Sequence, residues 1–147
     1  MACPIELHTH TLRSDGTLSP TDLVTRAHAH GVQVLALTDH DVTDGLAEAT
    51  ATANALGLRL IPGVEVSVTW DGQTVHVVGL SIDTANDALQ TGLARLREFR
   101  NWRAREMDRR LAKKRITGAY DYAASRAPAT FLPRPHFARF LIDQGYV

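Results

Sequence analysis

Short apolar runs alternate with helical segments through the first half of the chain, and this alternation restricts the fold more than any other feature. The predicted strands are residues 5–11, 32–37 and 58–63, and the predicted helices between them are residues 19–31 and 43–57. Ser19 and Pro20 form a typical helix start, with Asp22 completing a capping box, and Gly31 and Gly57 are typical helix ends. Strands that alternate with helices predict an α/β fold.

A β-hairpin is predicted next, because residues 64–70 and 73–80 are rich in β-branched residues and flank Asp71-Gly72. This dipeptide favours a two-residue type I′ turn, and such a turn fixes the register of the two strands. Trp70 then pairs with Gln73, Ser67 with His76, and Glu65 with Val78. Glu65 and His76 become diagonal neighbours on one face, about 7 to 8 Å apart at Cα, which is close enough to bind a common ion.

The rest of the chain is predicted to be mainly helical and is strongly basic at its start. One long helix is expected over residues 86–115, followed by a proline-broken loop and a short amphipathic helix that ends at Gly145. The net charge of zero hides an asymmetry: residues 1–94 carry −8, and residues 95–115 carry +7. We expect Trp102 to be a buried anchor of the long helix; stacking on a nucleobase is the alternative.

The composition excludes several classes of protein. The single cysteine, Cys3, rules out an internal disulfide framework, and no secretory signal pattern precedes it. No apolar run reaches the roughly 18 to 20 residues that cross a bilayer. We therefore expect a cytoplasmic protein with no membrane partner.

Histidine and acidic residues gather where the predicted strands end. His8 and His10 share one face of the first strand, and Asp15 lies in the turn after it. Asp39, His40 and Asp41 follow the second strand directly, and ligand sites of α/β folds lie at such strand ends. An H-x-H pair also arises by chance on surface strands, and Asp39 or Asp41 could instead cap the following helix. We expect the cap role for Asp41 and metal binding for His40.

Taken together, these positions predict a metal centre. The candidate ligands are His8, His10, Asp15, His40, Glu65 and His76. Mixed imidazole and carboxylate ligands suit manganese, iron or zinc, and six of them suit more than one ion. His28 and His30 are left out, because imidazolium at the last turn of a helix complements the helix dipole.

The motifs "LHTHTLRSDG", "ALTDHD", "GVEVSV" and "VHVVGL", in this order, resemble the polymerase and histidinol phosphatase (PHP) family of metal-dependent phosphoesterases. The resemblance implies part of a distorted (β/α)7 barrel with two to three divalent ions, manganese foremost, and the six candidate ligands match family ligand positions. It also implies two domains: residues 1–84 as the amino-terminal part of the barrel, and residues 85–147 as an inserted basic helical subdomain that covers the substrate.

Two departures from the family pattern stand out. Glu6 occupies a position where the family usually has aspartate, next to the ligands. The family also supplies three later ligands, a histidine from an "HPGR"-like stretch and an aspartate and a histidine from an "SDxH"-like stretch, and residues 77–147 contain neither. We therefore expect the carboxyl-terminal half of the barrel to be absent from this chain. The chain alone should bind metal incompletely and catalyse poorly, and either dimerisation or further chain should cover its open edge.

The substrate-binding candidates lie in the basic part of the chain. Arg100 and Arg103 are three residues apart on the long helix and could grip one phosphate, although a solvated basic face is the alternative. "RPHFARFLIDQGYV" resembles the subgroup that hydrolyses 3′,5′-nucleoside bisphosphates and short RNA 5′ ends. Arg134 and His136 flank Pro135 there and are expected to contact substrate; His136 could instead cap or pack on the last helix.

The expected activity is hydrolysis of nucleotide phosphate esters by a metal-activated hydroxide, with His40 and Asp39 as the candidate catalytic residues. The expected partner is a phosphorylated nucleotide or short RNA, not a DNA duplex. Two alternatives stay open. One is a phosphatase for histidinol phosphate or another small monoester, and the other is a non-catalytic module that binds metal or nucleotide.

Overall fold

The computed structural model describes residues 4–127, 132 and 134–147, so Cys3 and part of the proline-broken loop lie outside the described residues. The chain divides into two compact units, residues 1–93 and 94–147, and the division falls inside the long helix. Each unit is described by itself. The predicted domains, residues 1–84 and 85–147, stay a prediction.

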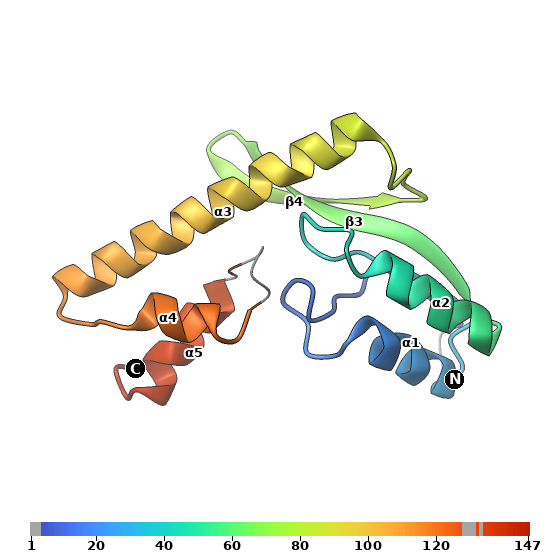
Figure 1. The fold of residues 1–147 in the computed structure, drawn as a ribbon, viewed down its shortest axis with the longest axis horizontal. Helices are drawn as coiled ribbons and strands as arrows, with labels where there is room; N and C mark the ends of the chain where they lie inside the picture. Colours follow the sequence, from blue (N-terminus) through green and yellow to red (C-terminus); the bar gives the residue numbers. More distant parts are fainter. Residues whose placement is uncertain (1–3, 128–131, 133) are drawn as a thin grey trace. The chain divides into compact units, whose positions relative to one another are not determined.

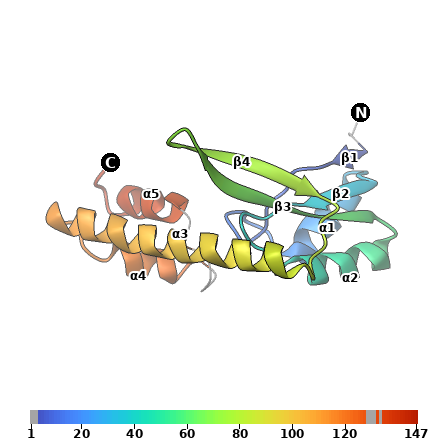
Figure 2. The ribbon, with the colours of Figure 1, turned by 90° about the horizontal axis from the view of Figure 1, so that it is seen from above.

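The first unit is built on one four-stranded sheet (Figure 2). Its strands are β1 (Ile5–Glu6), β2 (Val34–Leu37), β3 (Arg59–Trp70) and β4 (Gln73–Leu80), and they lie in the order β1-β2-β3-β4. The first three strands are parallel, and β4 runs antiparallel to β3. The predicted α/β class is confirmed. The sequence suggested a strand at residues 58–63 and another at 64–70, and β3 joins them.

Two helices, α1 (Pro20–Ala29) and α2 (Leu46–Leu56), cover one face of this sheet (Figure 1). Two of the predicted helix boundaries are confirmed. The side chain of Ser19 caps α1 by accepting a hydrogen bond from the backbone N–H of Asp22, and Gly57 ends α2 with a φ of 69°. The core between helices and sheet is aliphatic and consists of Val24, Leu35, Leu37, Leu46, Ala49, Ala53 and Leu58. Burial of these side chains fixes β2 and the start of β3 relative to α1 and α2.

The hairpin has the predicted register. Trp70 pairs with Gln73, Ser67 with His76, and Glu65 with Val78. Asp71 and Gly72 have φ of 47° and 73°, and a type I′ turn requires positive φ at both of its central positions. The turn chemistry therefore brings Glu65 and His76 to one face of the sheet.

The first strand is much shorter than predicted, because β1 pairs with β2 only at Ile5 and Glu6. Side chains hold the following residues beside β2. The hydroxyl of Thr9 donates to the carbonyl of Ala36 at 2.6 Å, and the hydroxyl of Thr38 accepts from the N–H of Thr9 at 3.1 Å. The threonine hydroxyls thus supplement the backbone hydrogen bond from the N–H of Thr38 to the carbonyl of Thr9, at 2.9 Å, just before His10.

The second unit is helical. It contains most of α3 (Asp87–Lys113), together with α4 (Ala119–Ala124) and α5 (Arg134–Asp143). Ala104 of α3 packs with residues of α4 and α5 around the buried rings of Phe137 and Phe140. The long helix and the final helix agree with the sequence prediction, whereas α4 was not predicted. In the described part of the chain, no helix combines the length and apolar character that crossing a membrane requires.

Candidate metal centre

All six candidate ligands lie close together at the carboxyl ends of β1 and β2 and on the β3–β4 hairpin. The Nε2 atoms of His8 and His10 are 3.0 Å apart, and the ring of His10 stacks on that of His40 with centroids 4.6 Å apart. The His40 and His76 centroids are 4.9 Å apart. Four imidazoles from separate segments therefore form a continuous row.

Glu65 is the acidic centre of this row. Its Oε2 atom lies 2.7 Å from Nε2 of His8 and 3.1 Å from Nε2 of His10, and its Oε1 atom lies 3.5 Å from Nδ1 of His76. The residue is only 6% exposed. Burial by itself raises the pKa of this carboxyl, but the hydrogen bond from His8 and the charges of the surrounding imidazoles outweigh it and lower the pKa. Glu65 is therefore an ionised, inward-facing carboxylate.

Backbone contacts fix Glu65 beside His40. Beyond the end of β2 the chain continues next to β3: the N–H of Asp41 donates to the carbonyl of Glu65 at 3.0 Å, and the N–H of Glu65 donates to the carbonyl of Asp39 at 3.2 Å. The prediction that Asp41 caps α2 is wrong, because α2 begins at Leu46 after Gly45. The Asp41 carboxylate instead accepts from the backbone N–H of Ser67 at 2.8 Å, which ties the hairpin to β2.

Asp39 holds the loop that carries the first histidines. Its carboxylate accepts from the N–H of Thr11 at 2.7 Å, from the hydroxyl of Thr11 at 2.6 Å and from the hydroxyl of Ser14 at 2.6 Å, and the residue is 2% exposed. A buried carboxylate with three donors is well suited to position His10 and Asp15. A direct catalytic role for Asp39 stays a prediction.

Sequence reasoning missed Thr9, Thr11, Ser14 and Thr38 as supports of the metal centre. The signal that could have found them is the run of small hydroxyl residues between the ligands in "THT" and at the end of β2 in "LTDH". Hydroxyls at buried positions need partners, and the buried carboxylate of Asp39 is one.

The donor atoms form three overlapping groups, each with its atoms within 4.8 Å of one another: His8, His10 and Glu65; His10, Asp15 and His40; and His40, Glu65 and His76. The donor set fits divalent ions, because mixed imidazole and carboxylate shells suit them. A further indication of a metal site is Nδ1 of His10. This atom is buried without a hydrogen-bond partner in the described chain and faces Asp15 at 3.6 Å.

The overlap restricts which groups can be filled together. A neutral imidazole offers one lone pair, so one histidine serves one ion, whereas a carboxylate has two oxygens. The first and third groups share only Glu65, with Oε2 toward His8 and Oε1 toward His76. These two groups could therefore each hold one ion, with Glu65 as the one residue that belongs to both.

The four expected substrate residues lie in the second unit. Arg100 is 8% exposed, Arg103 and His136 are half-buried, and Arg134 is exposed. Their contact with substrate stays a prediction. The expectation that Trp102 is a buried anchor is wrong, since its side chain is 60% exposed.

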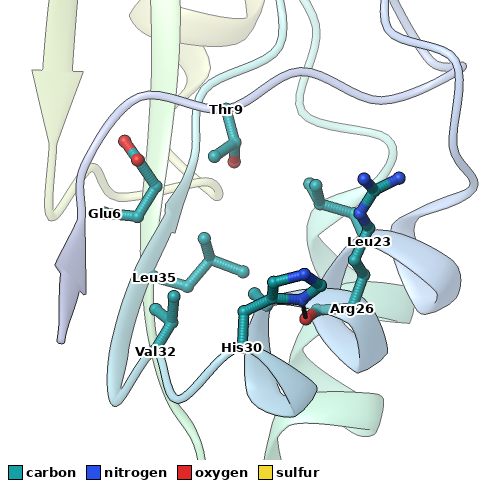
Figure 3. Close-up of a pocket in the computed structure, with 8 residues that line it drawn as sticks. Glu6, Thr9, Leu23, Arg26, His30, Val32 and Leu35 are labelled. Carbon is teal, nitrogen blue, oxygen red and sulfur yellow. Dashed lines mark hydrogen bonds between the residues drawn. The ribbon is translucent and has the colours of Figure 1, made fainter. Parts of the chain in front are cut away.

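A hollow of about 260 Å³ lies between α1 and the first two strands (Figure 3). Leu23, Val32 and Leu35 line it together with Arg26 and His30, and His30 Nδ1 lies 2.8 Å from the carbonyl oxygen of Arg26. The imidazole of His30 thus contacts the backbone at the end of α1, as expected for a histidine that is not among the candidate metal ligands. None of the six candidate ligands lines this hollow.

Comparisons with known proteins agree with this architecture. The PHP domain family model matches residues 6–125. A 3′,5′-nucleoside bisphosphate phosphatase of Chromobacterium violaceum is 49% identical over 144 residues, covering 97% of this chain and 50% of that protein. A 5′-3′ exoribonuclease of Haemophilus influenzae is 44% identical over 142 residues, covering 97% of this chain and 52% of that protein.

Solved structures agree as well. An amidohydrolase from Chromobacterium violaceum, with bound sulfate and no metal, superposes with a TM-score of 0.92 at 48% identity, over 99% of this chain and 51% of that one. A protein from Bifidobacterium adolescentis classed as a metal-dependent phosphoesterase superposes with a TM-score of 0.82 at 32% identity, over 97% of this chain and 51% of that one.

The fold corresponds to part of an α/β barrel, with the candidate ligands gathered at the carboxyl ends of β1 and β2 and on the hairpin. The chain belongs to the PHP domain family. It spans about half the length of the curated relatives it matches.

Proposed function

We propose that the protein is a metal-dependent phosphoesterase that hydrolyses phosphate esters of nucleotides. The expected substrates are the 3′-phosphate of 3′,5′-nucleoside bisphosphates and the 5′ ends of short RNA. The observation that carries the proposal is the convergence of four histidines and two carboxylates into three overlapping donor groups. The names of the two relatives, a bisphosphate phosphatase and an exoribonuclease, support this substrate class.

The residues of this chain have separate tasks in the proposal. His8, His10, Asp15, His40, Glu65 and His76 would hold two to three divalent ions, manganese by preference. When bound, such ions supply hydroxide at neutral pH and neutralise phosphate oxygens. Asp39 and Asp41 keep the ligand-bearing segments in register through hydrogen bonds to Thr11 and Ser67. Arg100, Arg103, Arg134 and His136 would orient the phosphates.

Phosphate release from a nucleoside bisphosphate and from histidinol phosphate, each with added manganese, tests the proposal. We expect faster release from the bisphosphate. Faster release from histidinol phosphate would favour the small-monoester alternative, and manganese binding without hydrolysis of either compound would favour the binding module.

The arginines are tested separately. In the complete enzyme, Arg100→Ala and Arg134→Ala should each lower kcat/KM for the bisphosphate by about tenfold or more, because each removes a charge-assisted hydrogen bond, while manganese content stays normal. Arg139→Ala is the matched control, since the Arg139 guanidinium pairs with Asp143 at 2.9 Å. If neither Arg100→Ala nor Arg134→Ala changed the kinetics, we would conclude that the basic helix does not bind substrate and that its charges only face solvent.

A further inference from the structure

Helix α3 has two different faces within the second unit. Ala104, Met107 and Leu111 pack onto α4 and α5. At 3.6 residues per turn, the opposite face carries a second row of residues. We call this row the outer stripe; it consists of Arg95, Phe99, Trp102, Glu106, Arg109, Arg110 and Lys113. All of them are exposed except Glu106, which is half-buried.

The outer stripe contains a pair of aromatic residues that are more than half exposed to solvent. Phe99 and Trp102 are 55% and 60% exposed. Their rings stack with centroids 5.6 Å apart and planes inclined by 26°. Two large rings on the solvent side of a helix lose the free energy that burial would give them, so their position calls for a ligand that covers flat apolar surfaces.

Most charges around these rings are positive, although the exposed Glu98 lies one helical turn before Trp102. Residues 95–115 carry ten Lys and Arg against three acidic residues. The single acid of the outer stripe, Glu106, pairs with two arginines of the same helix. Its carboxylate accepts a hydrogen bond from Nε of Arg109 at 2.7 Å and one from Nε of Arg110 at 2.8 Å. Arg95 and Lys113 lie at the two ends of the stripe, about 27 Å apart along the helix axis.

The composition of the stripe favours one kind of occupant. A helix seam that packs on another protein helix repeats aliphatic residues at heptad spacing, and the outer stripe has none. Aromatic rings flanked by cations are instead the means by which proteins bind unpaired nucleic-acid strands, because bases stack on the rings while cations follow the phosphates.

We propose that the outer stripe of α3 binds single-stranded nucleic acid, with bases stacked on Phe99 and Trp102 and phosphates at Arg95 and the cations after Glu106. The interaction reads no sequence, because every base has a π-face. It differs from the proposed phosphoesterase activity in needing neither metal nor hydrolysis, and it uses a face of α3 that does not include Arg100.

Tryptophan fluorescence tests the stacking directly. Trp70 and Trp102 are the only tryptophans, so in the Trp70→Phe variant all tryptophan emission comes from Trp102. We expect a short single-stranded oligouridine, added in the presence of EDTA, to quench this emission as it binds. A DNA oligothymidine should do the same, since stacking does not involve the 2′-hydroxyl. The absence of both quenching and binding would overturn the proposal.

Binding of fluorescein-labelled oligouridine to variants separates stacking from charge. The double variant Phe99→Leu/Trp102→Leu should weaken binding by about tenfold or more, because stacking on one ring already contributes about fivefold to a hundredfold. Trp70→Leu is the matched control: Trp70 is 76% exposed but lies in the hairpin of the first unit, and its loss should leave binding unchanged.

Further outcomes decide the proposal. The conservative variant Phe99→Tyr/Trp102→Tyr should restore most of the binding, which also shows that the loss in the leucine variant is not misfolding. Duplex RNA should bind equally to the unaltered chain and the leucine variant, because its bases are already stacked. If the unaltered chain and the leucine variant bound oligouridine with equal affinity, the stripe would act only through its charges. That result would overturn the proposal. A concentration-dependent dimer that the leucine variant abolishes would assign the rings to a second protein copy instead.

Discussion

The Nε2 atom of His8 lies 2.7 Å from Oε2 of Glu65, although 57 positions separate the two residues in the chain. The other Glu65 oxygen faces His76 at 3.5 Å. One carboxylate therefore connects the amino-terminal loop with the hairpin, with Oε2 toward the imidazoles of His8 and His10 and Oε1 toward that of His76. This arrangement makes distinct predictions for the three side chains.

We expect His8→Ala and His76→Ala each to remove one manganese ion from the chain, whereas Glu65→Gln should weaken both. The reason is that His8 and His76 belong to different donor groups, which share only Glu65. The loss of affinity for Glu65→Gln should be at least the ~10- to 100-fold typical of residues that merely support ligands. Manganese stoichiometry and affinity measured by calorimetry provide the test.

His28→Ala is the control for these variants, because His28 is an exposed residue of α1 outside every donor group. A Glu65→Gln variant that loses one ion and keeps the other at full affinity would show that Glu65 does not serve both donor groups.

A second prediction concerns the buried carboxylate of Asp39. Asp39→Asn removes the charge that accepts three hydrogen bonds, and the amide group cannot accept at its nitrogen. We expect the free energy of unfolding to fall by ~1–3 kcal/mol. Manganese binding should weaken with it, because Thr11 and Ser14 hold the segment that carries His10 and Asp15.

Chemical denaturation checks this prediction, and Asp44→Asn, an exposed carboxylate five positions further on, is the matched control. Equal stability of both variants would show that the hydrogen bonds around Asp39 contribute nothing net. In the complete enzyme, loss of turnover with full metal content and unchanged stability would favour a direct catalytic role for Asp39.

Local chemistry explains which parts of the fold could be predicted from the sequence. The Asp71-Gly72 turn fixes the hairpin register through positive φ, and Ser19 caps α1 through a hydrogen bond to a residue three positions away. Both signals act within a few residues. The turn accounts for the placing of Glu65 beside His76, whereas the meeting of His8, His10 and His40 with Glu65 follows from the parallel pairing of β1, β2 and β3, which the alternation of strands and helices predicts.

The wrong predictions depended on distant contacts. Asp41 has a side chain that is typical of helix caps, but its carboxylate accepts a hydrogen bond from a backbone N–H of β3 instead. Trp102 is large and apolar, yet α3 packs through its small residue Ala104 and leaves the tryptophan on the other side. Helix α4 begins after Gly118 with no side-chain cap, so its six residues carry no start signal.

A third prediction uses the glycine that closes the first ligand loop. A Cβ on Gly16 would lie 2.3 Å from the carbonyl oxygen of His10 and 2.7 Å from the N–H nitrogen of Thr11, so backbone would have to move. We expect Gly16→Ala to destabilise the fold by ~1–3 kcal/mol, as overpacking does, and to lower manganese affinity by displacing His10.

Gly92→Ala is the control, because it adds the same methyl group to a helical position with nothing within 4 Å. The free energy of unfolding of that variant should rise by ~0.5–1 kcal/mol, because alanine has a higher helix propensity than glycine. Thermal unfolding of both variants checks the pair. Equal stabilisation by the two changes would mean that the loop relaxes freely and does not hold His10 in place.

The last prediction concerns the acid of the outer stripe. Hydrogen bonds from Arg109 and then Arg110 lower the pKa of Glu106 from its ordinary value of 4.5 to about 2. Because the folded-state pKa is the lower one, the contribution of Glu106 to stability is present above pH 4.5 and is lost as the pH falls toward about 2. The pairs lie at the surface, where solvent screens them, so we expect only a small loss of thermal stability at neutral pH when they are removed.

Carbon-13 NMR titration of the Glu106 carboxyl measures this pKa directly. It should rise partway in Arg109→Gln or Arg110→Gln and approach 4.5 in the double variant, whereas Arg95→Gln, on the same stripe but more than two turns away, should leave it unchanged. High salt should raise it as well, because solvent ions screen exposed pairs. A pKa near 4.5 in the unaltered chain would mean that both guanidinium groups leave Glu106 in solution, so that its negative charge stands uncompensated beside Trp102.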